Sequence, residues 1–199
     1  GIALPLDQVE AIVAANPDHV VVVDEAYVDF GADSAVPLLQ KYENLLVVMT
    51  YSKSRSMAGA RLGFALGSRA LIQDLEKLKY STNPYNVNRL TLKLGQAAVD
   101  SDGYFREKAR EIMATREKTA QALRALGFTL PDSQANFLFV THPKVAGETL
   151  YRKCKEKGVL IRHFSDPAIA AYNRVTIGTP AEMEAFLAVV QTILKEEGA

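Results

Sequence analysis

The sequence predicts an α/β fold, because short apolar runs alternate with segments of helical periodicity. Three runs have the length of buried strands: Val20–Val23, Leu45–Met49 and Leu62–Leu66. Apolar residues recur at helical spacing in Leu6–Ala15, and Ser68 begins a second helix that runs to about residue 79. Strands that alternate with helices are typical of a parallel sheet with crossover helices, so we expect a mostly parallel sheet.

The second half of the chain predicts a smaller α/β unit. A turn-rich segment at residues 81–86 is the expected domain boundary, which divides the chain into residues 1–86 and 87–199. Two helices follow this boundary, at residues 88–99 and 104–126. The remaining expected strands are 135–140, 159–162 and 174–177, and the remaining expected helices are 146–157 and 180–196.

Composition excludes several classes of partner. Lys+Arg and Asp+Glu number 23 each, so the zero net charge argues against nucleic-acid and membrane partners. The single cysteine, Cys154, cannot form an internal disulfide, so we expect a reducing, cytoplasmic compartment. The three histidines, His19, His142 and His163, lack the spacing of metal ligands, and no metal site is predicted.

A lysine turn between two of the predicted strands carries the first chemical signal. Lys53 follows the run 45–49, and a lysine that is desolvated at a strand end can attack a carbonyl. Arg61 comes eight residues later, after the small-residue hinge 58–60, and its planar fork suits a phosphate. An amine for an aldehyde and a guanidinium for a phosphate together indicate pyridoxal 5'-phosphate as the cofactor.

The end of the first predicted strand adds a second signal. Asp24 follows Val20–Val23, and ligands of open α/β sheets bind at the carboxyl ends of strands. An anion there would keep a pyridine nitrogen protonated. Asp24 is the candidate for this role, and Glu25 is a weaker one. Tyr27 could donate to the ring's phenolic oxygen, and Ser52 could bind the phosphate together with Arg61. Asp24 could instead be an ordinary strand-end acid, Tyr27 could pack in the core, and Arg61 could form a surface salt bridge.

These residues occur in a recognisable order. The chain resembles the fold-type I, pyridoxal-phosphate-dependent aminotransferases through five segments: Asp24–Tyr27, Ser52–Lys53 with Arg61, Pro84–Asn86, Ala135–Phe137 and Arg174–Thr179. The resemblance covers essentially all 199 residues. It implies that residues 1–86 are the C-terminal part of the cofactor-binding large domain. Residues 87–199 would then be linking helices and a small C-terminal α/β domain.

The resemblance also implies substrate-binding residues. Arg174 matches an arginine that clamps the α-carboxylate of glutamate, and Arg162 matches one associated with a substrate phosphate. Tyr85 and Asn136 would lie near the cofactor and substrate, although each could instead have a packing or backbone role. Arg55 departs from the small or apolar residue expected after the lysine, and its role is open.

Within this family the chain is most similar to enzymes of histidine biosynthesis that transfer the amino group of L-histidinol phosphate to 2-oxoglutarate. Lys53 would bond the cofactor and move the proton. Three alternatives stay open: another class I/II aminotransferase, an enzyme resembling threonine-phosphate decarboxylases, and a non-catalytic fragment. The resemblance implies a homodimer and a missing segment before Gly1, so we expect this chain alone to bind its cofactor weakly and to have little activity.

Overall fold

The computed structural model describes residues 1–199, which divide into two compact units. One unit comprises residues 4–108, and the other comprises residues 109–199 together with residues 1–3. The dividing point lies inside the long helix α4 (Asp102–Ala125). The sequence predicted a different division, at residues 86/87, between a cofactor-binding domain and a small domain. That assignment of domains stays a prediction. None of the helices has both the length and the apolarity to cross a membrane.

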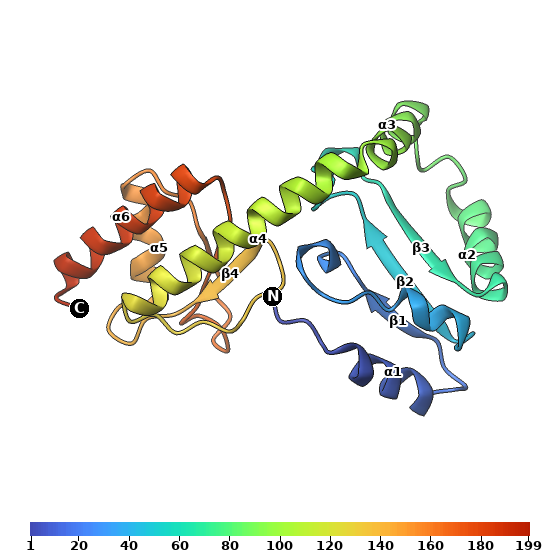
Figure 1. The fold of residues 1–199 in the computed structure, drawn as a ribbon, viewed down its shortest axis with the longest axis horizontal. Helices are drawn as coiled ribbons and strands as arrows, with labels where there is room; N and C mark the ends of the chain where they lie inside the picture. The colour runs from blue at the N-terminus through green and yellow to red at the C-terminus, as the bar shows by residue number, and fades with distance from the viewer. The chain divides into compact units, whose positions relative to one another are not determined.

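A three-stranded sheet forms the centre of the first unit (Figure 1). Its order is β1 (Val21–Asp24), β2 (Leu45–Thr50) and β3 (Gly63–Gly67). β1 and β2 are parallel, but β3 pairs antiparallel with β2. The expectation of a parallel sheet therefore holds for β1 and β2 but is wrong for β3. The connection from β2 holds only the short 3-10 helix η3 (Ala58–Ala60), and without a crossover helix the chain returns antiparallel.

One face of this sheet carries the core of the first unit. Helix α1 (Leu6–Ala15) and the 3-10 helix η2 (Val36–Gln40) cover it, and α1 has the bounds that the sequence predicted. Side chains alternate along a strand, so every second residue faces this core. The buried members are Val13, Ala35, Leu38, Leu45 and Val47. The opposite face is open at Val22, which is 57% exposed.

Three further helical segments complete the first unit. The 3-10 helix η1 (Val28–Phe30) follows β1 closely. Helix α2 (Arg69–Thr82) begins after Ser68, whose hydroxyl accepts a hydrogen bond from the Leu71 N–H, as the sequence predicted. Helix α3 (Arg89–Asp100) has a similar cap at its N-terminus.

The second unit is built on an entirely antiparallel sheet. Its order is β4 (Phe137–Val140), β6 (Asn173–Thr176) and β5 (Arg162–His163). The predicted strand over residues 159–162 is wrong except at its last residue. The Val159 N–H still bonds back to the carbonyl of Cys154, so the chain leaves the preceding helix too late to extend the strand.

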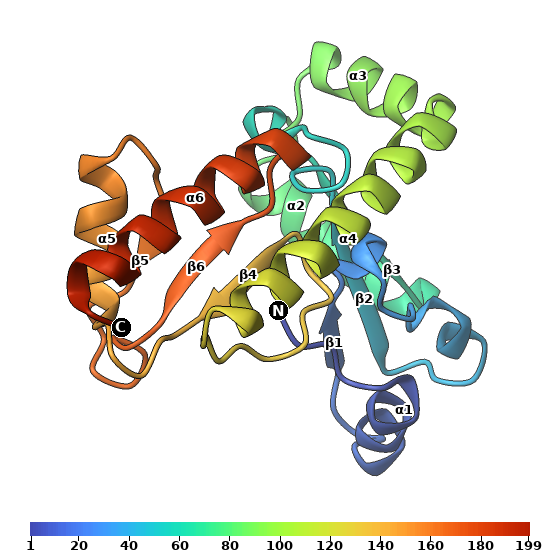
Figure 2. The same ribbon diagram turned by 60° about the vertical axis from the view of Figure 1, so that its left-hand side comes forward.

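Helices α5 (Gly147–Glu156) and α6 (Pro180–Glu197) lie beside this sheet (Figure 2). The part of α4 after residue 108 also contributes to the core of this unit. The fully buried side chains of the core include Leu123, Leu138, Val140, Leu150 and Ile193. Cys154 is buried among them, and burial raises the pKa of its thiol to about 11. The thiol is therefore protonated and acts as a small apolar group.

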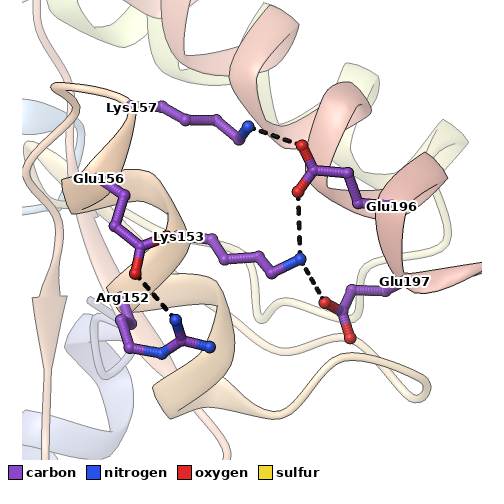
Figure 3. A network of polar contacts seen from close by, with 6 residues as sticks. All are labelled: Arg152, Lys153, Glu156, Lys157, Glu196 and Glu197. Atoms are coloured by element: carbon purple, nitrogen blue, oxygen red, sulfur yellow. Dashed lines mark hydrogen bonds and ion pairs between the residues drawn. The ribbon is translucent and has the colours of Figure 1, made fainter.

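Charged residues also connect α5 with α6 (Figure 3). The Lys153 ammonium lies 3.1 Å from Glu196 and 2.5 Å from Glu197, and Lys157 lies 2.7 Å from Glu196. Hydrogen bonds that Lys153 donates to Glu197 and then to Glu196 raise the pKa of Lys153, so the ammonium form is favoured. The network fixes the C-terminal turns of both helices to each other, while the apolar core supplies most of their stability.

The start of α6 is a capping box. The Thr179 hydroxyl accepts from the Glu182 N–H at 3.3 Å, and the Thr179 N–H donates to the Glu182 carboxylate at 2.7 Å. Pro180 occupies the first helical position, where its missing N–H costs nothing. This local chemistry explains why the sequence predicts the start of α6 correctly.

Replacing Thr179 by Ala removes an acceptor from the first turn of α6. We expect the free energy of unfolding to fall by about 1 kcal/mol, the usual cost of losing an N-cap. Thr192→Ala is the matched control, because the Thr192 hydroxyl only bonds the Ala188 carbonyl within the helix. Urea unfolding followed by circular dichroism measures both variants. Equal losses in the two variants would contradict the assignment of the cap.

The capping box also predicts a pH dependence. Hydrogen bonds from the backbone and then the side chain of Thr179 hold the pKa of Glu182 below its ordinary value of 4.5. The pKa of Glu182 is thus lower in the folded state than in the unfolded state. The ionised carboxylate stabilises the fold fully at a pH above its unfolded-state pKa, and this stabilisation is lost as the pH falls through its folded-state pKa. The stability difference between wild type and Glu182→Ala should therefore shrink on acidification. A difference that stays constant in urea titrations across this range would contradict the prediction.

Candidate functional site

A cavity of about 410 Å³ lies at the carboxyl ends of β1 and β2. Parallel pairing brings these two strand ends together at one edge of the sheet, which is where ligands of such sheets bind. Four of the residues predicted from the sequence line this cavity: Asp24, Ser52, Lys53 and Arg61. The other lining residues are Ala26, Val48, Met49, Thr50 and Ala58. A carboxylate, a hydroxyl, an amine and a guanidinium thus surround one cavity.

The two neighbouring carboxylates after β1 have different environments. Asp24 is exposed at the cavity, and one of its oxygens accepts from the Ala26 N–H at 2.9 Å. Glu25 is buried and faces the interior, where it accepts from the Ser34 hydroxyl at 2.7 Å and from the Ala35 N–H at 2.5 Å. Glu25 therefore holds the loop before η2, and Asp24 is the carboxylate that is available to a ligand.

Lys53 follows β2 in the turn beyond the strand. Its ammonium lies 5.5 Å from the centre of the Tyr27 ring, so Tyr27 also lies close to the cavity. The sequence predicted a desolvated lysine, and this prediction is wrong for the chain, because Lys53 is exposed. The strand ends at Thr50, and the side chain of Lys53 projects from the turn at the open mouth of the cavity.

Hydrogen bonds fix the backbone on either side of Lys53. The Thr50 hydroxyl accepts from the Ser52 N–H at 3.1 Å, and the Tyr51 N–H bonds the Leu62 carbonyl at 3.1 Å. The Met57 N–H in turn bonds the carbonyl of Tyr51 at 3.0 Å. Thr50 was not singled out from the sequence, although a hydroxyl just before a turn is a common signal for a side-chain bond to the backbone two residues on.

Arg61 follows η3 with its backbone in the left-handed region, at φ 53°. Its guanidinium bonds the Ala58 carbonyl at 3.1 Å, which leaves its other donors for a ligand in the cavity. Ser56, in the same turn, also has a positive φ of 54°. Two such non-glycine residues in one turn store strain, which is typical of functional sites.

Arg55, whose role the sequence left open, pairs with the first residue of helix α4. Its guanidinium lies 2.6 Å from the carboxylate of Asp102, and it also covers the ring of Phe105 at 5.3 Å. Asp102 binds Arg106 one turn further along the helix as well. No pattern in the sequence indicates this pair, because Arg55 and Asp102 are far apart along the chain.

The remaining candidates from the sequence divide between the two units. Arg162 and Arg174 lie opposite each other on β5 and β6 of the second unit, so the sheet brings these two cations together. The Nε atom of Arg174 is buried and has no hydrogen-bond partner. Asn136 lies just before β4, and its carbonyl accepts from the Ile177 N–H at 2.9 Å. The sequence left two roles open for Asn136, one near the cofactor and one in bonding the backbone. This contact is of the second kind.

Tyr85 lies between α2 and α3 in the first unit. It is 89% exposed and does not line the cavity. Its predicted place near a cofactor has no support from contacts within this unit.

The arrangement can bind and activate an organic phosphate that carries an aldehyde. Arg61 and Ser52 offer donors for the phosphate, and Lys53 offers an amine that can bond a carbonyl carbon. Asp24 offers an anion for a protonated ring nitrogen. The lining residues Ala26 and Ala58 are small, which leaves space for a planar ring.

Comparison with known proteins points to one family. Residues 1–190 match the family described as aminotransferase class I and II. The histidinol-phosphate aminotransferase of Brachyspira hyodysenteriae is 48% identical over 196 residues, which are 98% of this chain and 55% of that protein. Histidinol-phosphate aminotransferase 1 of Bordetella parapertussis is 51% identical over 193 residues, which are 97% of this chain and 54% of that protein.

A solved structure shows the same fold. The histidinol-phosphate aminotransferase of Sinorhizobium meliloti, in complex with pyridoxal-5'-phosphate, superimposes with a TM-score of 0.86 at 24% identity. The match covers 98% of this chain and 54% of that one. The chain thus spans about half the length of the curated relatives it matches. Coverage of one half does not tell which half it is, so the C-terminal placement stays a prediction.

The division of labour between the two carboxylates can be tested by substitution. Glu25→Ala leaves the Ser34 hydroxyl and the Ala35 N–H without their buried acceptor, so we expect a loss of about 1–3 kcal/mol of unfolding free energy. Asp24→Asn keeps an oxygen for the Ala26 N–H and should change stability by less than about 0.5 kcal/mol. Urea unfolding compares the two variants. A larger loss for Asp24→Asn would show that the roles are reversed.

Proposed function

Because the chain belongs to the aminotransferase class I and II family, we propose that it is part of a pyridoxal-phosphate-dependent transaminase that acts on L-histidinol phosphate and 2-oxoglutarate. The relatives named above carry that activity in their names, and they are about 50% identical to nearly the whole chain. The observation that carries the proposal is the cavity at the ends of β1 and β2, where Asp24, Ser52, Lys53 and Arg61 meet. The family's homodimeric assembly and its role in histidine biosynthesis are part of the proposal.

The donor set of the cavity fits pyridoxal phosphate. Arg61 and the Ser52 hydroxyl would bind its phosphate, and Asp24 would pair with its pyridine nitrogen. Tyr27, which lies beside the Lys53 ammonium, would donate to the phenolic oxygen. When bound, the cofactor supplies an aldehyde for the amino group and an electron sink for the substrate's Cα.

Lys53 would act twice in the reaction. Its amine would hold the cofactor through the aldehyde carbon. The same amine, when free, would move a proton from the substrate's Cα to the carbon that carried the aldehyde. The Tyr51 N–H bonds the Leu62 carbonyl and the Met57 N–H bonds the Tyr51 carbonyl, so the turn would keep the amine at the cavity in both roles.

The second unit would bind the acidic groups of the two substrates. The buried Nε of Arg174 lacks a partner, and a bidentate bond to the α-carboxylate of glutamate would satisfy it. Arg162, opposite Arg174 in the sheet, would bind the phosphate of L-histidinol phosphate. Asn136 and Tyr85 would contact the cofactor and substrate. Residues 1–86 would form part of the large domain, and residues 87–199 the linking helices and small domain.

Borohydride trapping tests the cofactor chemistry. Pyridoxal phosphate is titrated into the chain, the visible absorbance is recorded, and borohydride then fixes the cofactor for peptide mapping. We expect the label at Lys53, and we expect Lys53→Arg to lose it, because a guanidinium does not bond aldehydes. Lys77→Arg, at an exposed ion pair, is the matched control and should keep the label at Lys53. Label spread evenly over the surface lysines of the wild type would overturn the proposal.

The same assay tests the substrate class. L-histidinol phosphate competes with Lys53 for the aldehyde, so it should protect Lys53 from labelling. Threonine phosphate and L-phenylalanine, which represent the rival decarboxylase and aromatic aminotransferase, should protect less at equal concentration. Stronger protection by either of these would assign the chain to the rival activity and leave the cofactor chemistry intact.

A further inference from the structure

The ion pair between Arg55 and Asp102 is the strongest contact between the lysine turn and another element of the first unit. Arg55 is two residues after Lys53, and its guanidinium lies 2.6 Å from the carboxylate of Asp102. Asp102 is the first residue of α4, so this bond joins the turn to the start of a 24-residue helix. The side chain of Arg55 is only 20% exposed, and it also contacts the ring of Phe105.

Burial and geometry separate this pair from the surface ion pairs of the same unit. In the pair Lys77–Asp74, the side chains are 76% and 69% exposed, so water competes for both charges. In the pair Arg55–Asp102, the carboxylate is 36% exposed and also accepts from Arg106. Hydrogen bonds from Arg106 and then Arg55 keep the pKa of Asp102 below its ordinary value, so its charge persists at neutral pH.

The lysine turn needs such a contact, because its own backbone is strained. Ser56, directly after Arg55, has a positive φ, and its N–H bonds the carbonyl of Lys53 at 3.1 Å. Ser54 donates a hydrogen bond to the carboxylate of Asp29. Ser54 and Arg55 are therefore each tied to another part of the unit, while Lys53 itself stays exposed.

We propose that Arg55, held by Asp102, is a positioning residue that keeps the turn in the conformation in which the Lys53 amine faces the cavity. The inference rests on the proposed function, since it concerns how Lys53 meets an aldehyde. Arginine suits this place better than lysine, because its flat guanidinium can bond a carboxylate and lie over the Phe105 ring at the same time. Neither Arg55 nor Asp102 lines the cavity.

The experiment is borohydride trapping of pyridoxal phosphate on the whole chain, with the label at Lys53 divided by the label at Lys77 in the same sample. This ratio cancels differences in concentration and in general lysine reactivity. Arg55→Met keeps most of the side chain's apolar stem, and Asp102→Asn keeps the size of the carboxylate. We expect each to lower the ratio about tenfold, as for loss of a charged hydrogen bond, and the double variant to lower it no further.

Two controls separate positioning from stability. Asp18→Asn removes an exposed carboxylate of the same unit that is not the partner of Lys77, and it should leave the ratio unchanged. Asp102→Glu restores the charge and should recover most of the ratio lost in Asp102→Asn. Thermal unfolding of every variant, followed by circular dichroism, defines a temperature at which all of them are folded for the labelling.

The outcomes are distinguishable. If Lys53 is labelled preferentially in the wild type, and Arg55→Met and Asp102→Asn keep the wild-type ratio, this inference is overturned and the proposed function stands. A fall in the ratio that only follows the unfolded fraction of each variant would also overturn it. So would an Asp102→Glu variant whose ratio is as low as that of Asp102→Asn. A wild type in which Lys53 is labelled no more than Lys77 would overturn the proposed function and this inference together.

Discussion

The close approach of β3 to the end of β2 at Gly63 is the constraint on which the candidate site depends. A Cβ atom at Gly63 would lie 2.8 Å from the carbonyl oxygen of Met49, which real side chains essentially never show. Glycine therefore lets β3 begin directly beside the last residues of β2, and residues 51–62 must close into a tight turn. That turn carries Lys53 and Arg61 back to the same end of the sheet. The parallel pairing of β1 with β2 then adds Asp24 to this end.

Short-range chemistry explains which features the sequence predicted well. The bounds of α1, the cap of α2 at Ser68 and the capping box of α6 all depend on residues within one turn of each other. The gathering of Asp24, Ser52, Lys53 and Arg61 was predicted by a similar argument. Asp24 and Lys53 each come after a short apolar run, and Arg61 follows the small-residue hinge 58–60. Such features are encoded by neighbours along the chain, so they can be identified before a structure is known.

The features that the sequence missed depend on contacts that are distant along the chain. The antiparallel direction of β3 depends on the close approach of Gly63 to Met49, and a glycine in the sequence does not reveal which backbone approaches it. Glu25 and Asp24 looked nearly interchangeable in sequence, and only the position of the loop at Ser34 shows that one of them is buried.

Charges in this chain contribute more to geometry than to net stability. The network between α5 and α6 consists of partly exposed lysine and glutamate side chains, for which solvent screening leaves a small net energy. The pair between Arg55 and Asp102 is also partly exposed, with side chains that are 20% and 36% exposed, so it too contributes little net energy. A contact of this kind restricts a strained turn to one conformation, even where it adds little to the free energy of unfolding. Reactivity at Lys53 should therefore respond to this pair more strongly than the stability of the fold does.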